Sequence, residues 1–338
     1  MKRAVLNLMM RTNAFAPFRR ANRGKALVLM YHRFSLEEDG AATSARTFNE
    51  QLEYLKSHYT IVPLAKIAEH VRDGANLPPG LAAITIDDGF DDAYEIAFPL
   101  LRQHGAPATL FVITDFLDRK AWMWTDKMRF LTSRTEVEEF ELTIDGRQRR
   151  FELRGKWSRL DAATRLNEML KKLPDEEKEE EIKRIASILG MKLPDLPPLE
   201  YSPVTWEQAR EMDGAGIEIA SHTLTHPILT NVSDERLRRE LTGSRSRLEE
   251  ELGHEVRSFC YPNGNLDERV LGATSAAGYD HAVATLPGLN DERSDPLALK
   301  RISAAADLAH FVQSTSGFEQ MKNRLRGSRA EVLGEPVY

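Results

Sequence analysis

The 338 residues of the chain suffice for one large α/β domain or for a barrel that carries an insertion. Apolar residues make up 41% and charged residues 29%, a composition typical of folded globular proteins that excludes disordered and fibrous classes. The formal net charge of −6 provides no general attraction to nucleic acid, so we expect no nucleic-acid partner. The single cysteine, Cys260, excludes an intrachain disulfide framework.

The N-terminal leader, residues 1–25, is basic and partly apolar. Residues 4–10 resemble the apolar part of a signal peptide, but Arg11 interrupts the run and no small-residue cleavage site follows. No stretch approaches the ~20 apolar residues of a membrane span. We therefore predict a cytoplasmic protein without a transmembrane span. Residues 1–20 form either a helix packed on the surface or a basic amphipathic segment that makes the protein membrane-peripheral.

Short apolar runs that alternate with helix-period segments predict βα units. The predicted strands are 26–31, 60–63, 82–86, 108–113, 217–220, 256–261 and 279–284. Alternating βα units imply a parallel sheet. Seven similar units closing on themselves would form a distorted (β/α) barrel, whereas an open doubly wound sheet is the competing arrangement, and periodicity does not separate the two.

Helices are predicted between these strands from apolar periodicity and capping signals. The clearest are 48–56, 64–71, 93–104 and 234–252, the first of them behind a capping box formed by Thr47 and Glu50.

The alternation breaks between about residues 124 and 203, where charged residues and a proline-rich exit indicate an insertion. Residues 140–153 alternate around Asp145-Gly146 and predict a β-hairpin, and residues 159–173 and 175–189 predict two helices. The acidic run 176–181 is interpreted as a solvated helix face rather than a cation site. We expect this insertion to be either a lid over the substrate or a structural outgrowth.

Adjacent carboxylates follow the predicted strand 82–86. Because successive strand residues point to opposite faces, Asp87 and Asp88 share a site only if the strand ends there, which Gly89 allows. Such a pair at the carboxyl end of a strand favours a cation or a proton-transfer role. An alternative is that one of the two simply caps the following helix.

Two histidines four residues apart, His222 and His226, follow the predicted strand 217–220. On one face of a helical turn this spacing suits a single metal ion, although such pairs are often surface or packed residues. With one carboxylate, two imidazoles provide three protein ligands and leave a position open for water or substrate, as in catalytic metal sites. This assigns Asp88 to the metal and Asp87 to the base, although the physics alone permits the reverse order.

These residues resemble three motifs of the polysaccharide deacetylases of the NodB-homology type. Residues 85–89 (Thr-Ile-Asp-Asp-Gly) resemble T-F-D-D-G, in which the first Asp is the base and the second a metal ligand. Residues 222–226 are similar to H-[ST]-x-x-H, whose two histidines bind the metal, usually zinc. Residues 259–264 resemble F-R-x-P-Y-G, which implies that the backbone N–H of Asn263 stabilises the oxyanion.

The resemblance covers roughly residues 26–124 and 203–303 and implies the closed option, a distorted (β/α) barrel of about seven parallel strands. The expected organisation is a leader (1–25), a barrel in two parts (26–124 and 203–305), a charged α+β insertion (125–202), and a C-terminal helix and tail (306–338). Residues 31–33, 122–124 and 300–302 resemble a bacterial subgroup associated with exopolysaccharide or envelope-glycan synthesis.

The chain also departs from the family pattern. Cys260 stands where the third motif has an arginine that tunes the base, so Arg257 and Arg301 become candidates for this role; Cys260 itself is expected to be a packed residue. The motif that supplies the general acid is not evident. His310 fits it only superficially and is expected to be a surface histidine. His32, at the end of the first strand, is the candidate acid or a structural hydrogen-bonding residue.

The resemblance implies a zinc-dependent hydrolase that removes acetyl groups from an N-acetylated glycan or glycan precursor. Two histidines and one carboxylate also occur in non-haem iron sites, so the native metal is less determined than the site. The alternatives are a catalytically weak or inactive glycan-binding relative, for which Cys260 is the main support, and a metal amidohydrolase that acts on a lipid-linked sugar or another amide.

Overall fold

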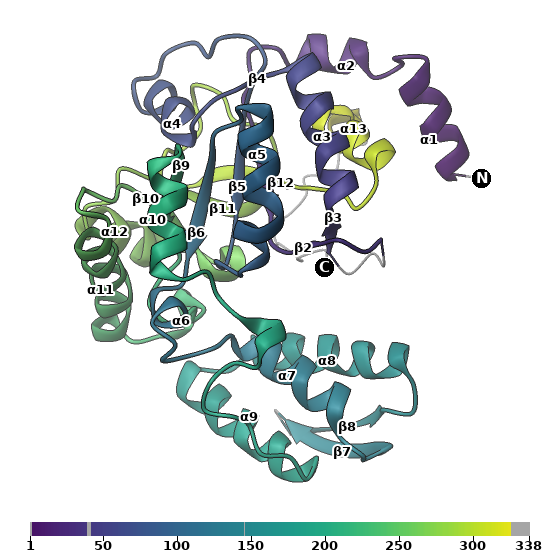
Figure 1. Cartoon of the computed structure of the whole chain (residues 1–338), viewed down its shortest axis with the longest axis vertical. Helices are drawn as coiled ribbons and strands as arrows, with labels where there is room; N and C mark the ends of the chain where they lie inside the picture. The colour runs from purple at the N-terminus through teal and green to yellow at the C-terminus, as the bar shows by residue number, and fades with distance from the viewer. Residues whose placement is uncertain (1, 39–41, 145, 326–338) are drawn as a thin grey trace.

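Seven parallel strands close into a ring in the computed structural model, which describes residues 2–38, 42–144 and 146–325 (Figure 1). In ring order they are β1 (Leu27–Tyr31), β12 (Leu299–Ser303), β11 (His281–Pro287), β10 (Ser258–Cys260), β9 (Ile217–Ser221), β6 (Ala108–Val112) and β5 (Leu81–Ile86). The β1–β5 pairing, with Leu29 opposite Ile84, closes the ring. All six residues of β5 are buried, as expected for a strand covered on both faces. The prediction of a (β/α) barrel is confirmed.

One predicted barrel strand was wrong and another was missed. The run 60–63 forms β4 (Thr60–Ile61), which pairs only with the start of β5 and lies outside the ring. The seventh place belongs to β12, in which the charged Arg301 occupies a buried position where an apolar residue would be expected. A charged residue on the inner side of a strand masks the apolar pattern on which the prediction depended.

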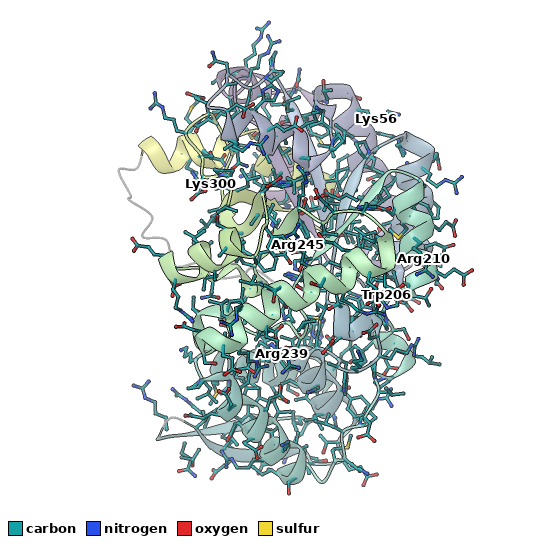
Figure 2. All side chains as sticks on the ribbon, turned by 90° about the vertical axis from the view of Figure 1, so that its left-hand side faces the viewer. Lys56, Trp206, Arg210, Arg239, Arg245 and Lys300 are labelled. Carbon is teal, nitrogen blue, oxygen red and sulfur yellow. The ribbon has the colours of Figure 1, made fainter. Side chains whose placement is uncertain are left out.

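Helices surround the ring (Figure 1). They are α3 (Ala45–His58), α4 (Leu64–Arg72), η1 (Ala93–Ala97), α5 (Phe98–His104), α6 (Thr114–Leu117), α10 (Trp206–Gly214), α11 (Asp234–Leu252) and α12 (Glu268–Ala276). Short elements are β2 (Phe34–Ser35), β3 (Thr43–Ser44), η2 (Leu199–Tyr201), η3 (Leu229–Asn231) and η4 (Pro262–Gly264). The long helix α11 crosses one face of the barrel, with Arg239 and Arg245 along it (Figure 2).

The predicted helix boundaries hold for α11 and need correction elsewhere. Helix α3 begins earlier than expected, because Ser44 rather than Thr47 is the N-cap and accepts the Thr47 N–H. The helix predicted over 93–104 begins as the π-helical turn η1 before α5 continues it. Neither Asp87 nor Asp88 caps it, since the residue at its start is Asp92.

The segment between the two halves of the barrel has its own apolar core and lies below the ring in Figure 1. It consists of α7 (Trp124–Arg134), the antiparallel hairpin β7 (Glu139–Ile144) and β8 (Arg147–Glu152), α8 (Lys156–Leu170) and α9 (Asp175–Ile188). The hairpin and both following helices were predicted, while the turn residue Asp145 lies outside the described residues. Phe90, Ile113 and Phe116, which follow β5 and β6, belong to the same core. The segment therefore packs against the carboxyl ends of these strands.

The first and last helices of the described residues pack together on the barrel. The leader forms α1 (Lys2–Arg11) and α2 (Ala16–Ala21), and the C-terminal part forms α13 (Leu308–Thr315) and α14 (Phe318–Leu325) where one helix was expected. Phe15 and Phe18 contact the ring of Phe318 edge to face, with centroids 6.0 and 5.0 Å away. The tail from residue 326 lies outside the described residues. No helix of the described ranges is long and apolar enough to cross a membrane.

Candidate metal site

Asp88, His222 and His226 meet at the carboxyl ends of β5 and β9, and their ligand atoms lie within 4.8 Å of one another. His222 Nε2 is 3.5 Å and His226 Nε2 is 3.7 Å from Asp88 Oδ1. Ligands about 2.1 Å from a tetrahedral metal ion stand about 3.4 Å apart. All three side chains are buried. The spacing and the donor set therefore fit a single divalent cation.

Backbone strain is concentrated at this site. Six non-glycine residues of the described ranges have positive φ, and four of them belong to the three motifs: Asp88 (77°), Thr223 (72°), His226 (60°) and Asn263 (58°). Each such conformation costs of order 1–3 kcal/mol and persists only where the surroundings enforce it. The histidines therefore converge through two left-handed residues in a loop, and not on a helical turn as their spacing suggested.

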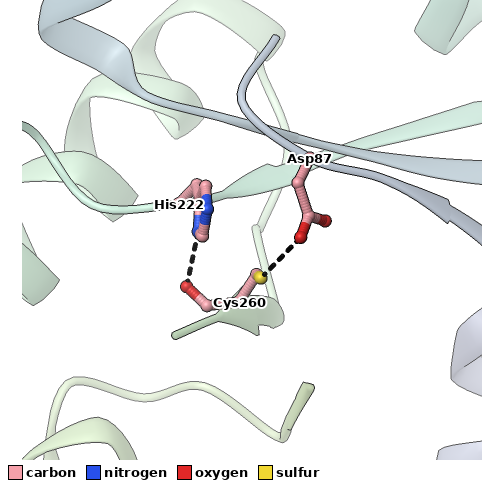
Figure 3. A group of neighbouring side chains, drawn as sticks. All are labelled: Asp87, His222 and Cys260. Atoms are coloured by element: carbon pink, nitrogen blue, oxygen red, sulfur yellow. Dashed lines mark hydrogen bonds between the residues drawn. The ribbon is translucent and has the colours of Figure 1, made fainter. Parts of the chain in front are cut away.

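A hydrogen bond fixes the tautomer of His222. Its Nδ1–H donates to the backbone carbonyl of Cys260 over 2.8 Å (Figure 3), which leaves Nε2, on the side of Asp88, as the atom that can bind a metal ion. His226 Nδ1 is buried and has no hydrogen-bond partner among the described residues. Burial and the neighbouring His222 lower the pKa of His226 to about 3, which keeps this imidazole neutral.

Glu240 on α11 holds the loop that carries the histidines. Its carboxylate accepts the backbone N–H groups of Leu224 and Thr225, both at 3.0 Å, and the Thr225 hydroxyl at 2.6 Å. Glu240 is itself buried, and Arg236 lies 3.7 Å away. No local sequence pattern indicated this role, because Glu240 is one of several acidic residues on a charged helix.

Asp87 is bound by a buried arginine from β12. Arg301 Nη1 and Nη2 donate to its two carboxylate oxygens at 2.7 and 2.8 Å, and Arg301 also donates to the Thr85 hydroxyl and the Ala284 carbonyl, both at 3.0 Å. Burial raises the pKa of Asp87, but the charge and hydrogen bonds of Arg301, together with the nearby His32 and His222, outweigh it and hold this pKa below its usual value. Asp87 is therefore ionised at neutral pH.

Cys260 lies beside the Asp87–Arg301 pair and contacts both residues. Its thiol is 3.6 Å from Asp87 Oδ2 (Figure 3) and accepts from Arg301 Nη2 at 3.2 Å. The thiol is fully buried, and burial raises its pKa. Asp87, His222 and Cys260 are close enough to form a second ligand set. Because Arg301 occupies both oxygens of Asp87, this set suits a cation less well than the first.

The remaining candidates for the acid and for tuning the base differ in their distance from Asp87. His32 Nε2 lies 3.8 Å from Asp87 Oδ2, and its side chain is 41% exposed. Arg257 is exposed and pairs with Glu255 and Asp280, away from Asp87. His310 is half exposed and pairs with Asp307.

The loop after β1 is anchored next to His32. Asp92 accepts from Arg33 Nε at 2.5 Å and from the Phe34 N–H at 3.1 Å, and the Arg33 guanidinium stacks 3.9 Å above the Phe90 ring. This pairing gives a structural role to Asp92, for which the sequence had suggested none.

Asn263 precedes a position that only glycine fits. In η4, a Cβ at Gly264 (φ +74°) would stand 1.9 Å from Thr285 Oγ1, and Thr285 donates to the Asn263 carbonyl at 3.2 Å. The backbone of Asn263 is thereby held in its left-handed conformation.

The comparisons with known proteins show the family to which the chain belongs. The family model "Polysaccharide deacetylase" matches residues 74–282, more than half of the chain, which therefore belongs to the polysaccharide deacetylase family. The putative polysaccharide deacetylase YxkH of Bacillus subtilis (strain 168) is 28% identical over 106 residues, 31% of this chain and 38% of that protein.

Solved structures of low sequence identity share the fold. The Streptococcus pyogenes deacetylase PplD aligns with a TM-score of 0.59 at 18% identity, over 87% of this chain and 99% of that chain. IcaB from Ammonifex degensii aligns with a TM-score of 0.56 at 19% identity, over 87% of this chain and 97% of that chain.

Proposed function

We propose that this chain is a metal-dependent deacetylase that hydrolyses the acetamide group of an N-acetylated oligosaccharide or polysaccharide. The observation that carries the proposal is the placement of the buried Asp87–Arg301 pair beside three convergent metal ligands, Asp88, His222 and His226. A carboxylate held ionised next to a three-ligand site with an open position suits hydrolysis.

Zinc is the cation that we expect, because the ligand set and its spacing fit a tetrahedral site. When bound, such an ion lowers the pKa of water and polarises the acetamide carbonyl. Asp87 then accepts the proton of the attacking water, and Arg301 keeps its carboxylate oriented and charged. The backbone N–H of Asn263 donates to the developing oxyanion. His32, within reach of Asp87 and exposed, gives a proton to the leaving amine, which leaves acetate and a free amino sugar.

The catalytically inactive alternative rested on Cys260 in place of the family's arginine. Arg301 reaches the same carboxylate from β12, which favours the active enzyme. We place the substrate in exopolysaccharide or envelope-glycan metabolism and the protein in the cytoplasm. Hydrolysis of a lipid-linked sugar or a non-sugar amide is distinguished by the substrate panel below.

The test is acetate release from N-acetylated glycans and non-glycan amides by protein of measured metal content. Asp87→Asn should keep its metal and lose turnover by about 10²–10⁴-fold, the usual contribution of a general base. His32→Ala should lose turnover without losing metal. Zinc-loaded protein that binds N-acetylated oligosaccharides and releases no acetate would support the glycan-binding alternative.

A further inference from the structure

A cavity of about 340 Å³ lies under the leader helix α2, at the end of the barrel opposite the metal site. Leu27, at the start of β1, and Gly80, just before β5, line it, whereas the metal site lies at the carboxyl ends of the strands. The sequence resemblance covers roughly residues 26–124 and 203–303, so about half of the residues that line the cavity lie outside it.

The lining is cationic and contains no Asp or Glu. Arg19, Arg20, Arg23 and Lys25 contribute to it, together with the uncharged Asn22, Ser57, Tyr59 and Ser316. Arg20 and Arg23 are exposed and form no ion pair with any described residue. The nearest carboxylate to Lys25 is Asp291, 3.8 Å away. Most arginines elsewhere on the surface are paired with carboxylates, so this cluster has an unmatched positive charge.

The surrounding leader strengthens this charge and adds apolar side chains. Residues 1–25 contain seven of the chain's 46 Lys and Arg and none of its 52 Asp and Glu. On α1, Val5 is 52% and Leu8 63% exposed, one helical turn apart. Helix α1 contacts α13, and Phe15 on the neighbouring turn is buried against Phe318, so the leader is fixed to the barrel.

The geometry points to a binding surface for anionic lipid headgroups, in which the cavity takes a lipid phosphate and α1 lays Val5 and Leu8 against the acyl boundary. Clustered arginines bind phosphate oxygens through paired, charge-assisted hydrogen bonds. A free phosphate would satisfy the arginines but leave the apolar residues of α1 without a partner, whereas a bilayer surface satisfies both. Docking through this end leaves the metal site accessible. The inference does not depend on the proposed deacetylase activity.

The experiment is co-sedimentation of the full chain with vesicles of phosphatidylcholine alone or with one third phosphatidylglycerol, at 50 and 300 mM NaCl. Binding is expected only to the anionic vesicles and is expected to weaken at the higher salt. Arg20→Gln/Arg23→Gln should lower the partition coefficient about 25-fold, the change to which two cations at ~1 kcal/mol each convert. The matched control Arg238→Gln/Arg239→Gln removes two exposed arginines of α11 that form no ion pair with a described residue. It should leave the partition coefficient unchanged.

A second variant separates the apolar contribution. Leu8→Ser should reduce binding to anionic vesicles at both salt concentrations, since its contact is not electrostatic. The inference is overturned if the wild-type chain does not bind anionic vesicles or if both double variants weaken binding equally. It is also overturned if the chain binds inorganic phosphate but does not bind vesicles. Circular dichroism of each variant confirms that it is folded.

Discussion

Arg301 and Asp87 form a buried, two-point ion pair although 214 residues separate them in the sequence. The arginine enters from the last strand of the barrel and the aspartate follows β5, so the pair exists only when the ring is closed. Cys260 is small enough to leave room for the guanidinium, which passes 3.2 Å from its sulfur. The third motif lacks its arginine in this chain, and Arg301 from β12 contacts Asp87 instead.

Replacing Arg301 should change the pH dependence of turnover as well as its rate. Because the charge of Arg301 lowers the pKa of Asp87, Arg301→Lys, which loses the two-point contact, should raise the pKa of this carboxyl. The acidic limb of the kcat/KM profile then moves to higher pH. At a fixed pH on that limb, kcat/KM falls about tenfold for each unit by which the pKa of Asp87 has risen. The control is Arg257→Lys, an exposed arginine paired with Glu255 and Asp280. An unchanged acidic limb in the Arg301 variant would mean that Arg301 does not set the pKa of the base, Asp87.

Glu240 should control metal affinity without touching the metal. Removing its carboxylate in Glu240→Ala leaves the N–H groups of Leu224 and Thr225 without their acceptor, and the loop that carries His222 and His226 loses its support. Loss of such supporting groups typically costs 10–100-fold in metal affinity. Competition with a chelator measures the dissociation constant.

The matched control for Glu240 lies on the same helix. Glu235→Ala removes an exposed acidic side chain of α11 and should leave the affinity unchanged. Equal affinities for the two variants would mean that the loop keeps its geometry without Glu240.

Apolar periodicity is a local signal, and it predicted the helices and a parallel sheet, whereas the family resemblance implied the closed (β/α) barrel. The predicted strands included β4 and omitted β12, because the buried Arg301 interrupts the apolar pattern of β12. The candidate metal ligands could be predicted because they lie in short local motifs, and the fold brings Asp88, His222 and His226 together. Glu240 and the Arg33–Asp92 pair were not, because their roles come from contacts across the fold and not from any local pattern.

The glycine after Asn263 should tolerate no side chain. At Gly264 a Cβ would meet both the hydroxyl and the backbone of Thr285, whereas at Gly105, with a similar φ of +60°, it would meet nothing within 4 Å. Gly105→Ala should therefore cost only the left-handed strain, about 1 kcal/mol of the free energy of unfolding. Gly264→Ala adds overpacking and should cost about 3 kcal/mol or more.

Denaturant unfolding and acetate release at saturating metal measure both effects of these alanine variants. Only Gly264→Ala should also lose turnover, because it displaces the Asn263 backbone. Similar unfolding free energies for both variants would show that the Thr285 contact relaxes at little cost.

Asp126 on α7 should make the metal-free protein less stable as the pH rises. The carboxyl is buried, its Oδ2 has no hydrogen-bond partner among the described residues, and Arg129 is 4.0 Å from its Oδ1. Burial, reinforced by the nearby charges of Asp88 and Asp92, raises its pKa to about 6. Between about pH 4 and this value the folded state binds more protons than the unfolded state, so stability falls as pH rises and is constant above.

The variant Asp126→Asn removes this titration, since its amide is neutral at every pH. It should leave the free energy of unfolding nearly unchanged at pH 4 and raise it at pH 7.5 by on the order of 2–3 kcal/mol. Asp195→Asn, at an exposed position of the same insertion, is the control and should show no such pH dependence. Urea unfolding at several pH values, in the presence of a chelator, measures the effect, because a cation next to Asp88 would itself stabilise the ionised carboxyl. A gain for Asp126→Asn that is the same at pH 4 and pH 7.5 would mean that Asp126 is already ionised in the folded protein at pH 4.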